Sequence, residues 1–159
     1  MSNILIAYFT WSGNSERLAG QIQQVTAGKL FRIAVREPYP ASYAMTASRA
    51  AKEKHRRSRP ELLQYLEDIE AYDTIYLVYP NWWNTVPMAV CAFLERYDFG
   101  GKHIMPLCTS GGSGIANSVK EIRALCPGAQ VDDGLLIAEQ LVGEPTAAKR
   151  MEQWIGEKT

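Results

Sequence analysis

The sequence has few cysteines and no excess of charge of either sign, and both facts exclude whole classes of protein. The chain of 159 residues has three cysteines, Cys91, Cys108 and Cys126, and no C-x-x-C pair. Such spacing argues against a disulfide framework or a zinc site and favours reduced, buried thiols in a cytoplasmic protein. The formal net charge is zero. Because nucleic acid binding requires a concentrated basic face, we expect none here.

Long apolar runs and histidines are also scarce. No apolar run approaches the roughly 18 residues of a transmembrane helix, so no membrane span is expected. Only His55 and His103 occur, and no metal cluster or Ser-His-Asp set is readable. The one basic run, residues 52–59, is interpreted either as a solvated helix end or as a contact surface for an anionic cofactor or partner. Asp132 and Asp133 are interpreted as solvated loop carboxylates.

Short apolar runs alternate with helical patterns along the whole chain. The predicted strands span residues 4–9, 30–35, 73–79, 102–108 and 134–138. The predicted helices span residues 14–26, 41–57, 60–66, 87–97, 113–125 and 146–155. This alternation predicts an α/β fold, a three-layer α/β/α sandwich with a five-stranded parallel sheet, in one domain over residues 1–159. Ligands of such sheets bind outside the carboxyl ends of the strands.

A loop rich in hydroxyl groups follows the first predicted strand. Its residues are Thr10, Trp11, Ser12, Gly13, Asn14 and Ser15. Its hydroxyl groups can donate hydrogen bonds, its glycine allows a ligand close to the backbone, and the next helix presents free N–H groups. These features predict a phosphate site. A helix cap made by Ser12 or Asn14, which needs no ligand, is the alternative.

Two later loops, after the third and fourth predicted strands, have unusual compositions. The earlier one consists of Pro80, Asn81, Trp82, Trp83, Asn84 and Thr85. The later one consists of Thr109, Ser110, Gly111, Gly112, Ser113 and Gly114. The tryptophan pair favours stacking on a flat aromatic ligand, although it could instead cover the sheet edge or form an oligomer contact. The glycines expose backbone donors, although a flexible connector with a Ser113 cap is the simpler interpretation.

Taken in order, the three loops resemble those of the flavodoxin family. Residues 10–15 are similar to its phosphate loop, and Pro80-x-Trp82-Trp83 and residues 110–114 are similar to its two flavin-flanking loops. The resemblance covers essentially the whole chain and implies the sheet order 2-1-3-4-5 with FMN as the cofactor. It further implies that Trp82 or Trp83 stacks on one flavin face, that the backbone of residues 81–85 approaches the ring's polar edge, and that residues 109–114 line the other face.

Two departures from flavodoxins leave the activity open. Carrier flavodoxins are generally acidic and usually place an aromatic residue of the third loop over the flavin, whereas this chain is neutral and its third loop has none. An insertion, residues 37–60, also follows the second strand. The resemblance therefore implies either an oxidoreductase passing electrons from NAD(P)H through FMN to a small acceptor such as a quinone, or an electron carrier serving redox partner proteins. A flavin-free binding module is the third alternative.

Overall fold

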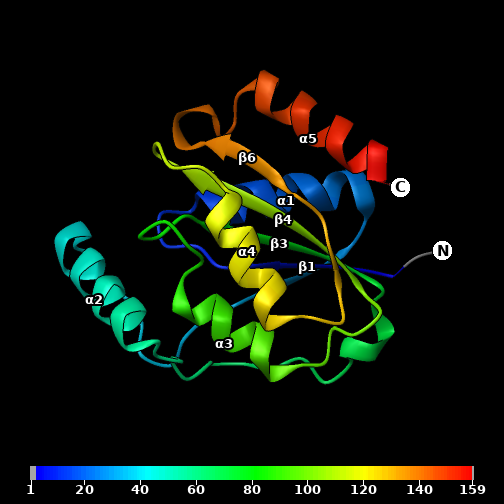
Figure 1. Cartoon of the computed structure of the whole chain (residues 1–159). Coiled ribbons are helices and arrows are strands. Elements are labelled where there is room, and N and C mark those ends of the chain that lie inside the picture. The colour runs from blue at the N-terminus through cyan, green and yellow to red at the C-terminus, as the bar shows by residue number, and fades with distance from the viewer. Residues whose placement is uncertain (1–2, 159) are drawn as a thin grey trace.

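The computed structural model describes residues 3–158. Its strands are β1 (Ile4–Tyr8), β2 (Lys29–Arg32), β3 (Thr74–Pro80), β4 (His103–Ser110), β5 (Gln130–Val131) and β6 (Leu135–Ala138). Its helices are α1 (Asn14–Thr26), α2 (Tyr43–Arg56), α3 (Met88–Arg96), α4 (Ala116–Leu125) and α5 (Pro145–Lys158), with short 3₁₀ turns at Ile69–Ala71 and Glu139–Leu141. Helices flank the sheet on both sides, and α2 stands apart beyond the strand ends (Figure 1).

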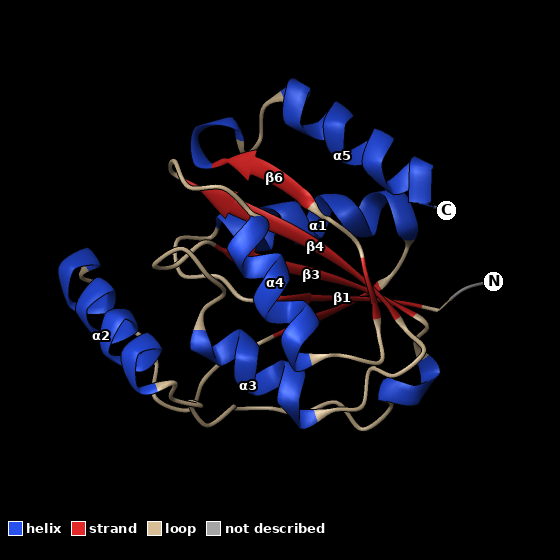
Figure 2. Ribbon diagram, viewed as in Figure 1, coloured by secondary structure: helices blue, strands red, loops and turns tan. Residues whose placement is uncertain are grey.

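The strands form one parallel sheet in the order β2-β1-β3-β4-β5, and β6 also pairs with β4. This confirms the predicted α/β sandwich and its strand order. Helical connections between parallel strands return the chain to the same starting edge. The carboxyl ends of β1, β3 and β4 therefore meet at one edge, which faces α2 (Figure 2).

Alternating side chains of the central strands pack into two cores, one on each face of the sheet. Leu5 packs with Phe93 and the rest of α3 on one face, together with α4. Ile6 packs with Trp154 and the rest of α5 on the other face, together with α1. Because both faces are covered, the strands read as continuous apolar runs rather than as alternating patterns.

The fifth predicted strand is β6, and a further two-residue strand, β5, precedes it, so the sheet has six strands instead of five. The registers of β4 against β5 and against β6 differ by one residue, which marks a bulge between them. The bulge lies beside Pro106, which has no N–H group for a strand ladder. Gly134 has a φ of 84° there, and an added Cβ would lie 2.8 Å from the Pro106 carbonyl oxygen. Only glycine suits this position.

The predicted helix over residues 60–66 is not formed. Its residues run alongside the segment after β2, where the Arg36 N–H donates to the Glu61 carbonyl and the Leu63 N–H donates to the Ala34 carbonyl, both at 2.8 Å. Leu62 is buried in the core by this pairing. Long-range hydrogen bonds and burial thus override the local helical pattern.

The three cysteines are free and buried, as the sequence predicts. Burial raises the pKa of the Cys91 and Cys108 thiols to about 12 and that of Cys126 to about 11. These thiols are therefore protonated and unreactive at neutral pH. Within residues 3–158, none of the helices has the length and apolar character that crossing a membrane requires.

Candidate functional site

The three loops predicted from the sequence lie together at the carboxyl edge of the sheet. The second and third loops touch, because the Asn81 N–H donates to the Thr109 carbonyl at 2.8 Å and the Asn81 side-chain amide donates to the Gly114 carbonyl at 3.2 Å. The first loop approaches the second through Phe9, whose ring centroid lies 5.2 Å from that of Trp82. The fold thus gathers the predicted residues 10–15, 80–85 and 109–114 at one edge.

The first loop leaves the start of α1 open. Gly13 precedes the helix with a φ of 98°, and no side chain caps it. The Thr10 hydroxyl instead accepts from the Gly13 N–H at 2.9 Å and closes the loop on itself. The alternative cap by Ser12 or Asn14 is therefore wrong. The leading amide groups of α1 point out of the helix, where an anion can bind them.

The second loop contains a tight turn with strained backbone. Trp82 and Thr85 exchange two backbone hydrogen bonds, of 3.0 and 3.2 Å. The residues between them, Trp83 and Asn84, have φ values of 52° and 63°, which suit glycine and asparagine but not tryptophan. The two indoles differ in environment, because Trp82 packs edge-on against neighbouring rings whereas Trp83 is 53% exposed. Strain of this kind is concentrated at functional sites.

The third loop folds around one serine. The Ser110 hydroxyl accepts from the N–H groups of Gly112 and Ser113, at 3.2 and 2.9 Å. These hydrogen bonds hold in a turn the residues that were predicted to start a helix, so α4 begins at Ala116 instead of at residue 113. The interpretation of Ser113 as a helix cap is wrong, because Ile115 occupies the cap position without a side-chain hydrogen bond.

Each loop carries one buried side-chain oxygen without a hydrogen-bond partner. These atoms are Ser15 Oγ, Asn81 Oδ1 and Thr109 Oγ1, and the described residues contain one further such atom, in Gln21. A buried polar group left unpaired costs about 1–3 kcal/mol. Three such atoms at one edge fit a ligand that supplies the missing partners. Together with the open start of α1, they fit a phosphate-bearing ligand with further polar groups, which is the chemistry of FMN.

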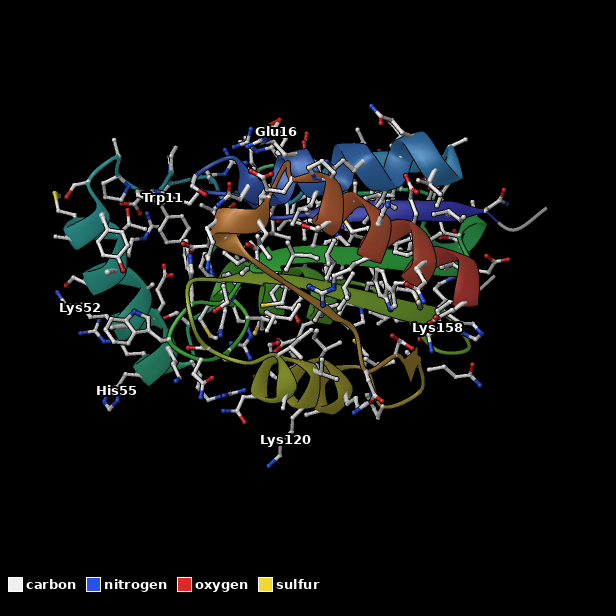
Figure 3. The ribbon with its side chains drawn as sticks, turned by 90° about the horizontal axis from the view of Figure 1, so that it is seen from above. Trp11, Glu16, Lys52, His55, Lys120 and Lys158 are labelled. Carbon is white, nitrogen blue, oxygen red and sulfur yellow. The ribbon has the colours of Figure 1, made fainter. Side chains whose placement is uncertain are left out.

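The sequence left open where the 37–60 insertion lies, and the structure places it at this same edge. The Trp83 indole N–H donates to the Ala47 carbonyl of α2 at 2.9 Å, and the Lys54 ammonium donates back to the Trp83 carbonyl. The Trp11 indole N–H donates to the Pro40 carbonyl at 2.8 Å. Figure 3 shows Trp11 in the space between α2 and the main body. The insertion is therefore tied to the first and second loops.

Sequence reasoning missed the inner face of α2. Tyr43, Thr46, Ala47 and Ala50 come from this face, and with Asn81 and the three loop tryptophans they line a cavity of about 200 Å³. We call it the α2 cavity. The i, i+3, i+4, i+7 spacing of the four α2 residues is typical of one helix face, but the sequence does not indicate what that face covers.

The basic run at the end of α2 does not serve as a cluster of free cations. The Arg57 guanidinium pairs with Glu121 of α4, and that of Arg59 pairs with Glu95 of α3, both at 2.7 Å. Lys52 and His55 project away from the main body (Figure 3). The run therefore anchors α2 to the body, through Arg57 and Arg59 to α4 and α3 and through Lys54 to the second loop.

Comparison with known proteins agrees with this geometry. A flavodoxin family model matches residues 3–157, and the chain belongs to the flavodoxin family. The sequence resemblance is thereby confirmed, and FMN is the cofactor expected of this family. No curated protein sequence matches the chain.

Three solved structures illustrate the similarity. A candidate flavoprotein from Bacteroides uniformis ATCC 8492 is 33% identical with a TM-score of 0.85, covering 98% of both chains. A flavoprotein from Lactobacillus acidophilus NCFM in complex with FMN is 21% identical with a TM-score of 0.76, covering 92% of this chain and 99% of that one. Fusobacterium nucleatum flavodoxin bound to FMN is 18% identical with a TM-score of 0.65, covering 99% of this chain and 96% of that one.

Proposed function

We propose that this chain is a redox protein that binds FMN at the carboxyl edge of its sheet. The observation that carries the proposal is the set of buried, unpartnered oxygens in the loops. The Ser15 hydroxyl lies in the first turn of α1, beside the open amide groups, and would donate to the phosphate. The Thr109 hydroxyl lies at the end of β4 and would serve the flavin side of the ligand.

The remaining loop residues complete the proposed site. Residues 10–15 would hold the phosphate, the backbone of residues 81–85 would meet the polar edge of the ring, and residues 109–114 would line one face. Trp82 or Trp83 would stack on the other face. Bound FMN supplies the capacity to accept and release electrons, while the protein supplies position and electrostatics.

Titration of the purified protein with FMN, followed by flavin fluorescence, tests this proposal. We expect binding and quenching of the flavin emission. The variant Ser12→Ala should weaken FMN binding more than riboflavin binding, because only FMN carries the phosphate. A wild-type protein that leaves FMN fluorescence unchanged would instead support a flavin-free binding module.

We further propose that electrons pass from NAD(P)H through FMN to a small acceptor such as a quinone. A ring-sized cavity next to the loops supports a small molecule as reaction partner, and the zero net charge offers little steering toward a protein partner. Reduced, buried thiols support a cytoplasmic setting. Anaerobic mixing of the FMN-loaded protein with NADH and with NADPH should bleach the visible flavin absorbance.

An electron carrier for redox partner proteins is the second candidate function. It is favoured by the exposed basic residues on the outer side of α2, among them Lys52 and His55, which could meet an acidic partner (Figure 3). Flavin that resists both nicotinamide cofactors but takes up electrons one at a time from a chemical reductant would support the carrier and contradict the reductase.

A further inference from the structure

The α2 cavity lies beside the proposed flavin site and differs from it in size. An engineered protein cavity of roughly 150 Å³ holds benzene, so about 200 Å³ suits one or two fused rings. The three fused rings of a flavin are too large to be enclosed there. The lining contains residues of the first two loops and of α2 but none of the third loop. The cavity therefore has room for a second, smaller ring.

The aromatic walls of the cavity are held in place by the insertion. The indole N–H groups of Trp11 and Trp83 are bound by the carbonyls of Pro40 and Ala47. The hydroxyl of Thr46 also donates to the Pro40 carbonyl, at 2.7 Å. Because these donors are already used, the walls present aromatic and aliphatic surface to whatever enters. Such a lining selects a planar apolar ring.

One buried polar atom of the lining has no hydrogen-bond partner. The side-chain amide of Asn81 donates to the Gly114 carbonyl, which fixes the orientation of the group, and its Oδ1 is buried without a partner. Asn81 lines the α2 cavity, whereas Ser15 and Thr109 do not. A ring that carries an O–H or N–H donor would satisfy this acceptor.

No ionised side chain lines the cavity. The nearby Lys54 ammonium is engaged by the Trp83 carbonyl, and Lys52 lines an open groove on the other side of α2. A charged ring or a phosphate would therefore find no counter-ion inside. We propose that the α2 cavity binds a neutral aromatic ring that carries a hydroxyl group, the phenol and hydroquinone class. A reduced quinone acceptor belongs to this class, so the assignment rests on the proposed function.

Calorimetric titration of the FMN-loaded protein with para-cresol and with para-xylene tests the inference. The two probes share ring and size, because the xylene has a methyl group in place of the hydroxyl, and only the cresol has a donor for Asn81. We expect the cresol to bind about tenfold more tightly than the xylene. In the Asn81→Ala protein this preference should disappear, because the side-chain acceptor that distinguishes the two probes is removed.

Filling the cavity supplies the second arm of the test. Ala50→Leu and Ala47→Leu place extra carbon atoms inside the cavity, whereas Ala44→Leu adds the same atoms to the exposed outer side of α2. We expect the two filling variants to lose cresol binding and the Ala44→Leu control to keep it. All three should bind FMN with the wild-type affinity, and circular dichroism melting would establish that each one folds.

Three results would overturn the inference. The first is a wild-type protein that binds neither probe, and the second is cresol binding that survives in both filling variants. The third is a filling variant that loses FMN affinity together with cresol binding, because the cavity would then belong to the flavin. Failure of the proposed function has a different signature, since it appears as absent FMN binding in the wild-type protein.

Discussion

Two regions of this molecule, the bulge in its sheet and the carboxyl edge of its strands, treat their polar atoms in opposite ways. At the bulge between β5 and β6, the Asp132 carboxylate accepts from the Gly134 N–H at 2.9 Å and from the Trp154 indole at 3.1 Å, and it pairs with Lys158 at 3.0 Å. At the carboxyl edge, three loops each keep a buried oxygen without a partner. Satisfied polar groups are typical of a structural region, whereas unsatisfied ones call for an explanation, which at this edge is the proposed ligand.

The bulge also shows how hydrogen bonds decide the charge state of a carboxyl group. Burial would raise the pKa of Asp132, but the hydrogen bonds from Gly134, Lys158 and Trp154 outweigh it and hold that pKa below its ordinary value. The interpretation of Asp132 as a solvated loop carboxylate is therefore wrong. Asp133 has a 95% exposed side chain that pairs with Arg123, so the interpretation as a solvated carboxylate fits this residue better.

The largest expected effect tests whether the bulge is purely structural. Gly134→Ala should lower the free energy of unfolding by about 2–3 kcal/mol, because its Cβ would collide with Pro106 at a positive φ. Gly112→Ala is the matched control, since a Cβ there meets nothing within 4 Å. Urea unfolding measures both. Equal stabilities of the two variants would contradict a glycine requirement at the bulge.

Removing the tryptophans of the second loop should affect ligand binding. Trp82→Ala or Trp83→Ala should weaken FMN binding by about 1–3 kcal/mol for the residue that stacks, by analogy with bases on aromatic side chains. Trp82→Ala should also lower stability, because that indole packs against Phe9 and Tyr39. Fluorescence titration and thermal melting separate the two effects. Unchanged FMN affinity in both variants would remove stacking from the proposed site.

An unsatisfied buried oxygen at the carboxyl edge should lower the free energy of unfolding, and a substitution that removes the oxygen should restore it. Ser15→Ala should raise the free energy of unfolding of the flavin-free protein by about 1 kcal/mol while weakening FMN binding. The control is Ser118→Ala, a buried serine whose hydroxyl lies 2.8 Å from the Tyr79 hydroxyl and 2.7 Å from the Ile115 carbonyl. That variant should lose about 1 kcal/mol. Equal losses of stability in the two serine variants would contradict the assignment of the Ser15 hydroxyl as an unpartnered group.

The smallest effect concerns acid stability. Because folding depresses the pKa of Asp132, its contribution is present above the ordinary aspartate pKa of about 4 and is lost as the pH falls through the lower folded value. Asp132→Asn should therefore be less stable at neutral pH and lose less stability on acidification. Urea unfolding at a series of pH values measures this, with Asp133→Asn as the exposed control. Parallel pH profiles of wild type and Asp132→Asn would refute the assignment.

Much of the fold and of the candidate site could be predicted from the sequence, because both have local signatures. Doubly buried strands read as apolar runs, and their alternation with helical patterns predicts a parallel sheet. The loops at residues 10–15, 80–85 and 109–114 stand out through hydroxyl groups, glycines and paired tryptophans. Parallel strands bring the loops that follow them to one edge. Loop composition and the predicted strand arrangement together therefore indicated which residues gather there.

Features that depend on contacts between residues distant in sequence were decided by the tertiary structure. The break between β5 and β6 follows from Pro106 on the neighbouring strand, and the missing helix at residues 60–66 follows from pairing with the segment after β2. The position of α2 depends on hydrogen bonds from Trp11 and Trp83 and on the ion pairs of Arg57 and Arg59, and the α2 cavity is lined by residues that are distant in sequence. Composition and periodicity identify which groups are available. Which of those groups find partners is settled only when the chain has packed, and three of the four unpartnered side-chain oxygens of the described residues lie in the loops of the proposed site.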